Sequence, residues 1–162
     1  MFEWIERLHI DVDAGTARGE ARVPAGHALL ADHFPGLPVL PATLLIELAA
    51  QVAGPLAEEI TRRRHGVERW AVLSVVRQAA FTRPTPLPAH VVLDARSVRV
   101  DPRAVLLAVT AAASQDAEPP METLRAELLM AMVEAQPGWD AALRARRERI
   151  ARWSAPVPGT GA

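Results

Sequence analysis

The stretch that decides the fold reads His33-Phe34-Pro35-Gly36-Leu37-Pro38-Val39-Leu40-Pro41-Ala42-Thr43-Leu44-Leu45-Ile46-Glu47. It begins with an imidazole in a turn rich in proline and glycine, and it ends with a carboxylate in an almost wholly apolar segment. A lone charge among apolar side chains is costly to bury unless it is paired or used. We therefore interpret the stretch as an active site with one ionisable group on a rigid loop and another on a buried helix.

The helix that carries Glu47 is expected to begin at about Pro41, since proline suits the first helical turn. It should end at Arg64 or His65, before Gly66. Its first half is apolar on nearly every face, which predicts that it is enclosed on all sides and that Glu47 is kept dry. Pro55 is expected to kink or interrupt the helix.

Segments rich in β-forming residues lie on both sides of this helix in the sequence. Residues 8–12 and 17–23 alternate between apolar and polar and predict a hairpin. Residues 70–77, 91–100, 105–113 and 123–133 follow, and short turns favour an antiparallel meander of these four. The predicted fold class is α+β, with a curved antiparallel sheet wrapped around one long central helix.

The pattern changes at Pro137, after which Trp139, Leu143, Ile150 and Trp153 fall on roughly one face of an amphipathic helix. We predict a main domain over residues 1–136, an extra C-terminal helix over residues 137–154, and a flexible tail over residues 155–162.

Composition excludes several classes of function. The chain has 162 residues, a net charge of −1 and no cysteine, which argues against general nucleic-acid binding, disulfides and thiolate chemistry. His9, His27, His65 and His90 lack metal-ligand spacing, so neither a metal nor another cofactor is predicted. The N-terminus lacks the pattern of a signal peptide, and polar residues and prolines interrupt the most apolar run. A cytoplasmic protein without a membrane span is expected.

Two motifs resemble the 3-hydroxyacyl-acyl-carrier-protein dehydratases of the FabZ/FabA type. The first is the His33-Phe34-Pro35-Gly36 turn, followed by Pro38, Pro41, Glu47 and Gln51. The second is Ala80-Phe81-Thr82-Arg83-Pro84-Thr85-Pro86-Leu87-Pro88, which is similar to the Arg-Phe-x-x-Pro-Val-x-Pro-Gly-Asp segment of that family. The resemblance extends over roughly residues 19–133.

The resemblance implies the hotdog fold, and a dimer in which one subunit supplies the histidine and the other the carboxylate. It also implies a 3-hydroxyacyl substrate linked through phosphopantetheine to an acyl carrier protein, in fatty-acid or polyene and secondary-metabolite biosynthesis. His33 and Glu47 are 14 residues apart in the sequence, with a rigid helix between them, which favours a site built from two chains. A homodimer, an oligomer of dimers and a heterodimer with a paralogue all remain open.

The reaction removes a proton from C2 and expels the C3 hydroxyl. His33 suits the base, because imidazole titrates near neutral pH. Glu47 suits the acid, because desolvation in an apolar pocket favours a protonated carboxyl. The N–H group of Ala42, where the family usually has glycine, is expected to bind the thioester oxygen, with Thr43 as a second candidate. The resemblance assigns supporting roles to Gln51, which would orient Glu47, and to Gly36.

Some features depart from the family pattern or have more than one interpretation. Ala42 replaces glycine and Asp32 precedes the histidine, so a catalytically weak subunit of a heterodimer is one alternative and a hotdog acyl thioesterase another. Arg62, Arg63 and Arg64 are interpreted as a solvated helix end. They and Arg83 are also weak candidates for docking the carrier protein.

Overall fold

The computed structural model describes residues 3–30, 33, 36–115 and 119–155. Its centre is an antiparallel sheet in the order β1-β2-β4-β5-β6-β3. The strands are β1 (Ile5–Asp11), β2 (Thr16–Val23), β3 (Trp70–Phe81), β4 (Ala89–Asp101), β5 (Ala104–Ser114) and β6 (Met121–Val133). The helices are α1 (Ala42–His65), α2 (Asp140–Ser154) and a short 3₁₀ turn, η1 (Ala28–Leu30). This arrangement confirms the predicted α+β class, a curved sheet around one long helix.

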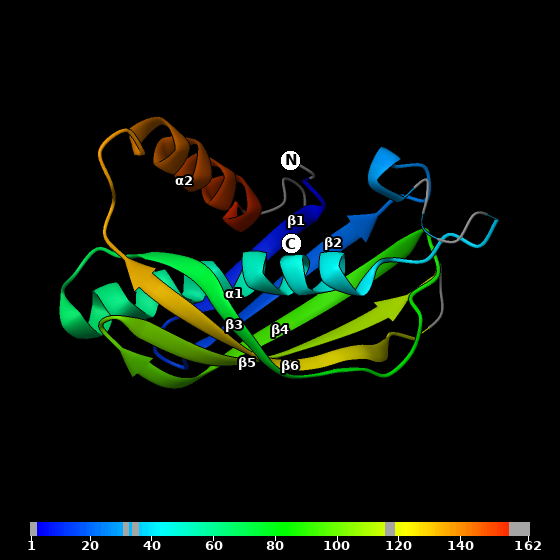
Figure 1. The fold of residues 1–162 in the computed structure, drawn as a ribbon, viewed down its shortest axis with the longest axis horizontal. Helices are drawn as coiled ribbons and strands as arrows, with labels where there is room; N and C mark the ends of the chain where they lie inside the picture. Colours follow the sequence, from blue (N-terminus) through cyan, green and yellow to red (C-terminus); the bar gives the residue numbers. More distant parts are fainter. Residues whose placement is uncertain (1–2, 31–32, 34–35, 116–118, 156–162) are drawn as a thin grey trace, which may run out of the picture.

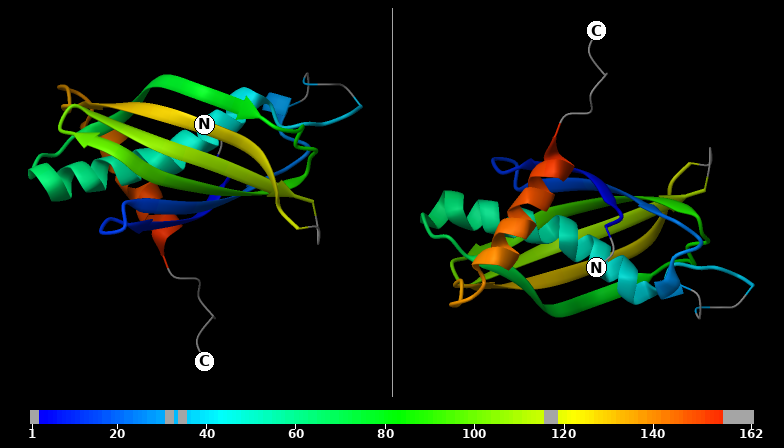
Figure 2. Two further views of the ribbon diagram at one scale, coloured as in Figure 1. Left: turned by 90° about the horizontal axis from the view of Figure 1, so that it is seen from below. Right: turned by 90° about the horizontal axis from the view of Figure 1, so that it is seen from above.

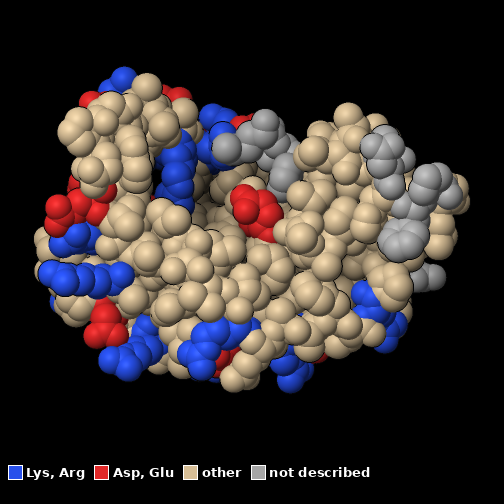
Figure 3. Space-filling model, viewed as in Figure 1, with Lys and Arg blue, Asp and Glu red and all other residues tan. Residues whose placement is uncertain are grey.

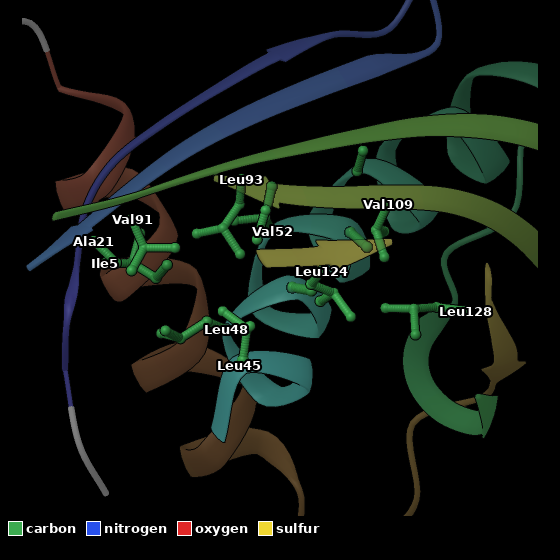
Figure 4. Close-up of a cluster of buried hydrophobic side chains, with 14 of the residues drawn as sticks. Ile5, Ala21, Leu45, Leu48, Val52, Val91, Leu93, Val109, Leu124 and Leu128 are labelled. Carbon is green, nitrogen blue, oxygen red and sulfur yellow. The ribbon is translucent and has the colours of Figure 1, made fainter. Parts of the chain in front are cut away.

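Helix α1 lies in the concave side of the sheet, and the main core fills the space between them (Figures 1 and 4). Leu48, Val52 and Leu56 recur every four residues on one helical face and are fully buried. Gly19 of β2 lets this face approach closely, since a Cβ there would lie 2.4 Å from Cγ2 of Val52. The core thus fixes which face of α1 is turned away from the sheet.

The order of the strands differs from the predicted meander. β4, β5 and β6 do form one, but β3 pairs with β6 at the sheet edge and not with β4. The cause is the connection over residues 82–88, which contains three prolines and does not fold into a hairpin. It runs beside the segment before α1 instead: Leu40 N–H donates to the Thr85 carbonyl (2.8 Å), and Leu87 N–H to that of Pro38 (2.9 Å).

Helix α1 is less enclosed than predicted. The sheet covers one side, and the side chains of Ala42, Thr43 and Glu47 are exposed on the other within a single chain. The prediction that the strands alone keep Glu47 dry is therefore wrong for one subunit. The helix also continues through Pro55 without interruption and ends at Gly66, whose φ of 66° and N–H bond to the Arg62 carbonyl form a left-handed cap.

Helix α2 lies across the side of α1 that the sheet leaves open (Figure 2). Trp153 is buried, and Ile150 packs against the main core. The predicted tail begins at Ala155, and the rest of it falls outside the described residues. None of the helices that the structure describes is long and apolar enough to cross a bilayer.

Candidate active site

His33 lies beside the start of α1. Together with Leu29, Pro41, Thr43 and Leu44, it lines an open cavity of about 350 Å³. His33 is half-buried, and its backbone N–H donates to the Leu30 carbonyl of η1 at 3.2 Å. The hydrogen bonds between residues 38–40 and 85–87 hold the following part of the loop in place.

The N-terminus of α1 offers hydrogen-bond donors in the same place. The N–H groups of Leu44 and Leu45 donate to the Pro41 carbonyl, at 3.0 and 3.1 Å. The N–H groups of Ala42 and Thr43 come before this first helical bond, where a helix leaves its donors unsatisfied. They lie at the positive end of the helix dipole and suit an oxygen that gains negative charge. One chain thus brings an imidazole and two N–H donors together.

Glu47 faces a different cavity. Gln51, one turn further along α1, donates from Nε2 to Glu47 Oε1 at 3.0 Å and so fixes the orientation of the carboxyl group. Both side chains line an open space of about 530 Å³ between α1, β3, β6 and α2. The amide leaves the second carboxyl oxygen without a described protein partner, and that oxygen is therefore available to a substrate.

The two predicted catalytic side chains do not meet within one chain. His33 lines the cavity at the helix start, Glu47 lines the cavity beside α2, and neither cavity contains both. Glu47 is five residues beyond Ala42, so it lies about 7.5 Å further along the axis and about 140° around the helix. A site shared between two subunits stays a prediction.

The remaining predicted residues are spread over the surface. Gly36 is exposed in the loop with a φ of 83°, a backbone conformation that favours glycine. Arg62 pairs with Glu59, and Arg63 lies 3.4 Å from Asp13 at the far end of α1. Arg83 lies in the connection that pairs with the loop before α1, so it is on the same side of the fold as His33.

One buried polar cluster was missed at the sequence level. Glu58 of α1 accepts a hydrogen bond from the Ala71 N–H of β3 at 2.9 Å and pairs with Arg146 of α2 at 2.6 Å. Burial raises the pKa of Glu58, against the opposing effects of the Arg146 guanidinium and the Ala71 N–H. The spacing of Glu58 and Glu59 in a polar helical segment suggested only a solvated face, and the partners lie far away in the sequence.

This cluster predicts a pH effect on stability. The folded state binds the Glu58 proton more tightly than the unfolded state, because the pKa is raised from its ordinary value of 4.5. The contribution of Glu58 is therefore fully present below pH 4.5 and is lost as pH rises through the raised pKa. The unfolding free energy of the wild type minus that of Glu58→Gln should decrease over this range in urea titrations. Glu68→Gln, which removes an exposed carboxylate near Arg147, is the matched control; a difference that grows with pH would contradict the prediction.

Comparison with known proteins finds similarity to dehydratases in the part of the chain that carries this site. A family model of ApeI-like proteins, described as ApeI dehydratase, matches residues 9–85, which include His33, Ala42, Glu47 and Gln51. The 3-hydroxyacyl-[acyl-carrier-protein] dehydratase FabZ of Protochlamydia amoebophila is 31% identical over 77 residues. Over about half of its length, the chain is similar to these dehydratases. The match covers 48% of this chain and 47% of the FabZ protein, so it spans about half the length of each.

Solved structures confirm the hotdog fold of this chain. A Streptococcus mutans protein bound to acetyl-CoA superimposes with a TM-score of 0.61 and 15% identity, over 84% of this chain and 94% of its own. A hypothetical thioesterase from Streptococcus pneumoniae with coenzyme A gives 0.57 and 11%, over 82% and 86%. The hexameric thioesterase y2039 of Yersinia pestis gives 0.55 and 13%, over 71% and 84%. At these identities the likeness establishes the fold alone.

Proposed function

We propose that the protein dehydrates a 3-hydroxyacyl thioester on an acyl carrier protein to the trans-2-enoyl thioester, in a site shared by two subunits. The observation that carries the proposal is the division of groups within one chain: His33 and the start of α1 line one cavity, and Glu47 lines another. The match of the dehydratase family model to residues 9–85 and the FabZ match over 77 residues support the reaction type.

The proposed chemistry follows from the order of the substrate atoms. C2 is bonded to the thioester carbon, so a base at C2 and donors at the carbonyl oxygen must be neighbours. His33 and Thr43 line one cavity, and Ala42 precedes Thr43 at the start of the helix. An imidazole nitrogen of His33 takes the C2 proton, and the electrons of that C–H bond form the C2–C3 double bond. The C3–O bond breaks, and the departing hydroxyl takes a proton from Glu47 of the partner subunit and leaves as water. His33 ends protonated and the glutamate ionised, and proton exchange with water restores both.

Strand β3 supports the proposed dimer. It is one of the two edge strands of the sheet, and its exposed large apolar side chains are Val72, Val75, Val76 and Phe81. Long apolar edges are unusual in monomers, because they invite pairing with another strand. Antiparallel pairing of two β3 edges around a twofold axis would extend the sheet through both subunits. It would also bring a second chain to the side of α1 on which Glu47 is exposed.

For the carrier protein, the geometry favours Arg83 over the three arginines at the end of α1. Arg62 lies 15 residues beyond Glu47, about 22 Å along the helix, whereas Arg83 lies on the same side of the fold as the His33 loop. We therefore place the docking of the acidic carrier at Arg83.

The test is an assay with a 3-hydroxyacyl carrier-protein thioester, read by mass spectrometry of the intact carrier. The proposal expects loss of water with the acyl group retained. Release of free thiol without loss of water would instead identify a thioesterase, as several of the structural neighbours are named. No reaction by the pure homodimer, with activity restored by a paralogue, would identify a partner subunit.

A further inference from the structure

The cavity beside α2 has a polar rim and an apolar interior. Glu47 and Gln51 form the rim, and the apolar lining comes from α1, β3, β6 and α2. In Figure 3 the surface is hollowed beside the lobe that α2 forms at the upper left, with acidic and basic atoms at the margin of the hollow. The apolar side chains that line it are Leu73, Met130, Leu143, Ile150 and Trp153.

Small residues keep this space open. Ala50 and Gly54 on α1, Ala71 on β3, and Ala142 and Ala145 on α2 line it without filling it. The volume of about 530 Å³ lies within the range of pockets that enclose most of a small-molecule ligand. The cavity is thus large enough for a flexible apolar chain.

Helix α2 is held in place as the outer wall. Arg146 pairs with the buried Glu58, and Arg149 pairs with Glu3 at 3.0 Å. Gly54 permits this close approach, since a Cβ there would lie 3.3 Å from Nη2 of Arg146. The buried Trp153 anchors the last turn of α2. These contacts fix the width of the cavity.

The rim carries a polar atom that points to a ligand. Gln51 Oε1 is buried and accepts no hydrogen bond from the part of the chain that the structure describes. Nε2 of the same amide donates to Glu47. A buried acceptor without a donor is costly, and a bound group with an O–H or N–H would remove that cost. A ligand with a polar head at Glu47 and Gln51 and an apolar tail beyond them fits both parts of the cavity.

The order of atoms in the substrate connects this cavity to the proposed reaction. Glu47 must reach the C3 hydroxyl, and C4, the first carbon of the tail, is bonded directly to C3. The tail therefore begins next to Glu47, where the apolar space opens. We propose that the acyl chain of the substrate lies in this cavity, with α2 as its outer wall and Leu143 at the end farther from Glu47. The inference rests on the proposed function.

The position of Leu143 in the cavity, away from Glu47, follows from the contacts of Arg146 on the same face of α2. Arg146, one turn later, contacts α1 at Gly54 and Glu58. Gly54 is seven residues beyond Glu47, about 10 Å along α1. A larger side chain at Leu143 would thus shorten the cavity without reaching the reacting carbons.

The experiment measures kcat/KM for 3-hydroxyacyl thioesters of increasing chain length. Leu143→Trp should lower kcat/KM for the longest chains that the wild type accepts by roughly tenfold or more, because the indole would occupy the space of the chain end. For the shortest chains, which do not reach Leu143, kcat/KM should stay within about twofold of the wild-type value. Leu143→Ala should shift the preference toward longer chains. The matched control is Ala141→Trp, which adds the same indole to an exposed position of α2 outside the cavity.

A binding arm separates this inference from the proposed function. Saturated acyl-pantetheine thioethers, which cannot react, are titrated into wild type and both tryptophan variants by calorimetry, with circular dichroism to show that each is folded. Chain-dependent binding that Leu143→Trp alone weakens would support the cavity assignment even if no substrate were dehydrated. Dehydration with an unchanged chain-length profile in both Leu143 variants would overturn it and leave the proposed function standing.

Discussion

Replacing His33 with alanine is expected to lower kcat/KM for dehydration by about 10²- to 10⁴-fold, the usual contribution of a positioned general base. His33 lines the same cavity as Pro41 and Thr43 at the start of α1, so in the proposed reaction it is the titratable group that reaches C2 of the substrate. The rate is measured with the carrier-protein assay, and the oligomeric state by analytical ultracentrifugation.

The matched control is His65→Ala, which removes an exposed imidazole from the C-terminal turn of α1. It should keep wild-type activity, because that turn lies far along the helix from the reacting groups. A His33→Ala protein that assembles normally and dehydrates as fast as wild type would show that another group is the base.

Replacing Glu47 with glutamine should produce a loss of the same order, about 10²- to 10⁴-fold, because the amide cannot donate the proton that the departing hydroxyl needs. Glutamine is nearly isosteric and keeps an oxygen for the Gln51 N–H, so packing is retained. Gln51→Glu is an unsuitable control because it adds a charge at the site. Glu59→Gln, on the same helix outside this cavity, is the matched one.

Mixing the two inactive proteins tests whether the site is shared. A twofold dimer of one His33→Ala chain and one Glu47→Gln chain has one site with both groups intact and one with neither. Random exchange of subunits should restore about a quarter of wild-type activity, since half of the dimers are mixed and each has one good site. Mixing His33→Ala with the double variant should restore none. Absence of recovery after proven exchange would place both groups in one subunit.

Sequence patterns over a few neighbouring residues correctly predicted individual strands and the ends of α1. The alternation in residues 17–23 gave the strand β2, and Pro41 and Gly66 marked the two ends of α1. The spacing from His33 to Gln51 indicated the family that the sequence comparisons then supported. Each of these rests on residues close together in the chain.

Features that depend on distant partners could not be predicted in the same way. The pairing of β3 with β6 depends on the path of the proline-rich connection after β3. The residues of β3 alone do not determine which strand it pairs with. The exposure of Glu47 depends on where the sheet stops covering α1. The Glu58–Arg146 pair joins residues 88 positions apart and was invisible for the same reason.

The apolar edge of β3 also affects the risk of aggregation of a newly synthesised chain. Soluble proteins protect free edges with charges, prolines or bulges. β3 has irregularities between Leu73 and Val75 and near Gln78, whose φ is 50°, but the exposed side chains of Val72, Val75 and Val76 are all apolar. An unassembled subunit would therefore be a template for aggregation, so that solubility, and with it cellular abundance, depends on how quickly the edge finds a partner.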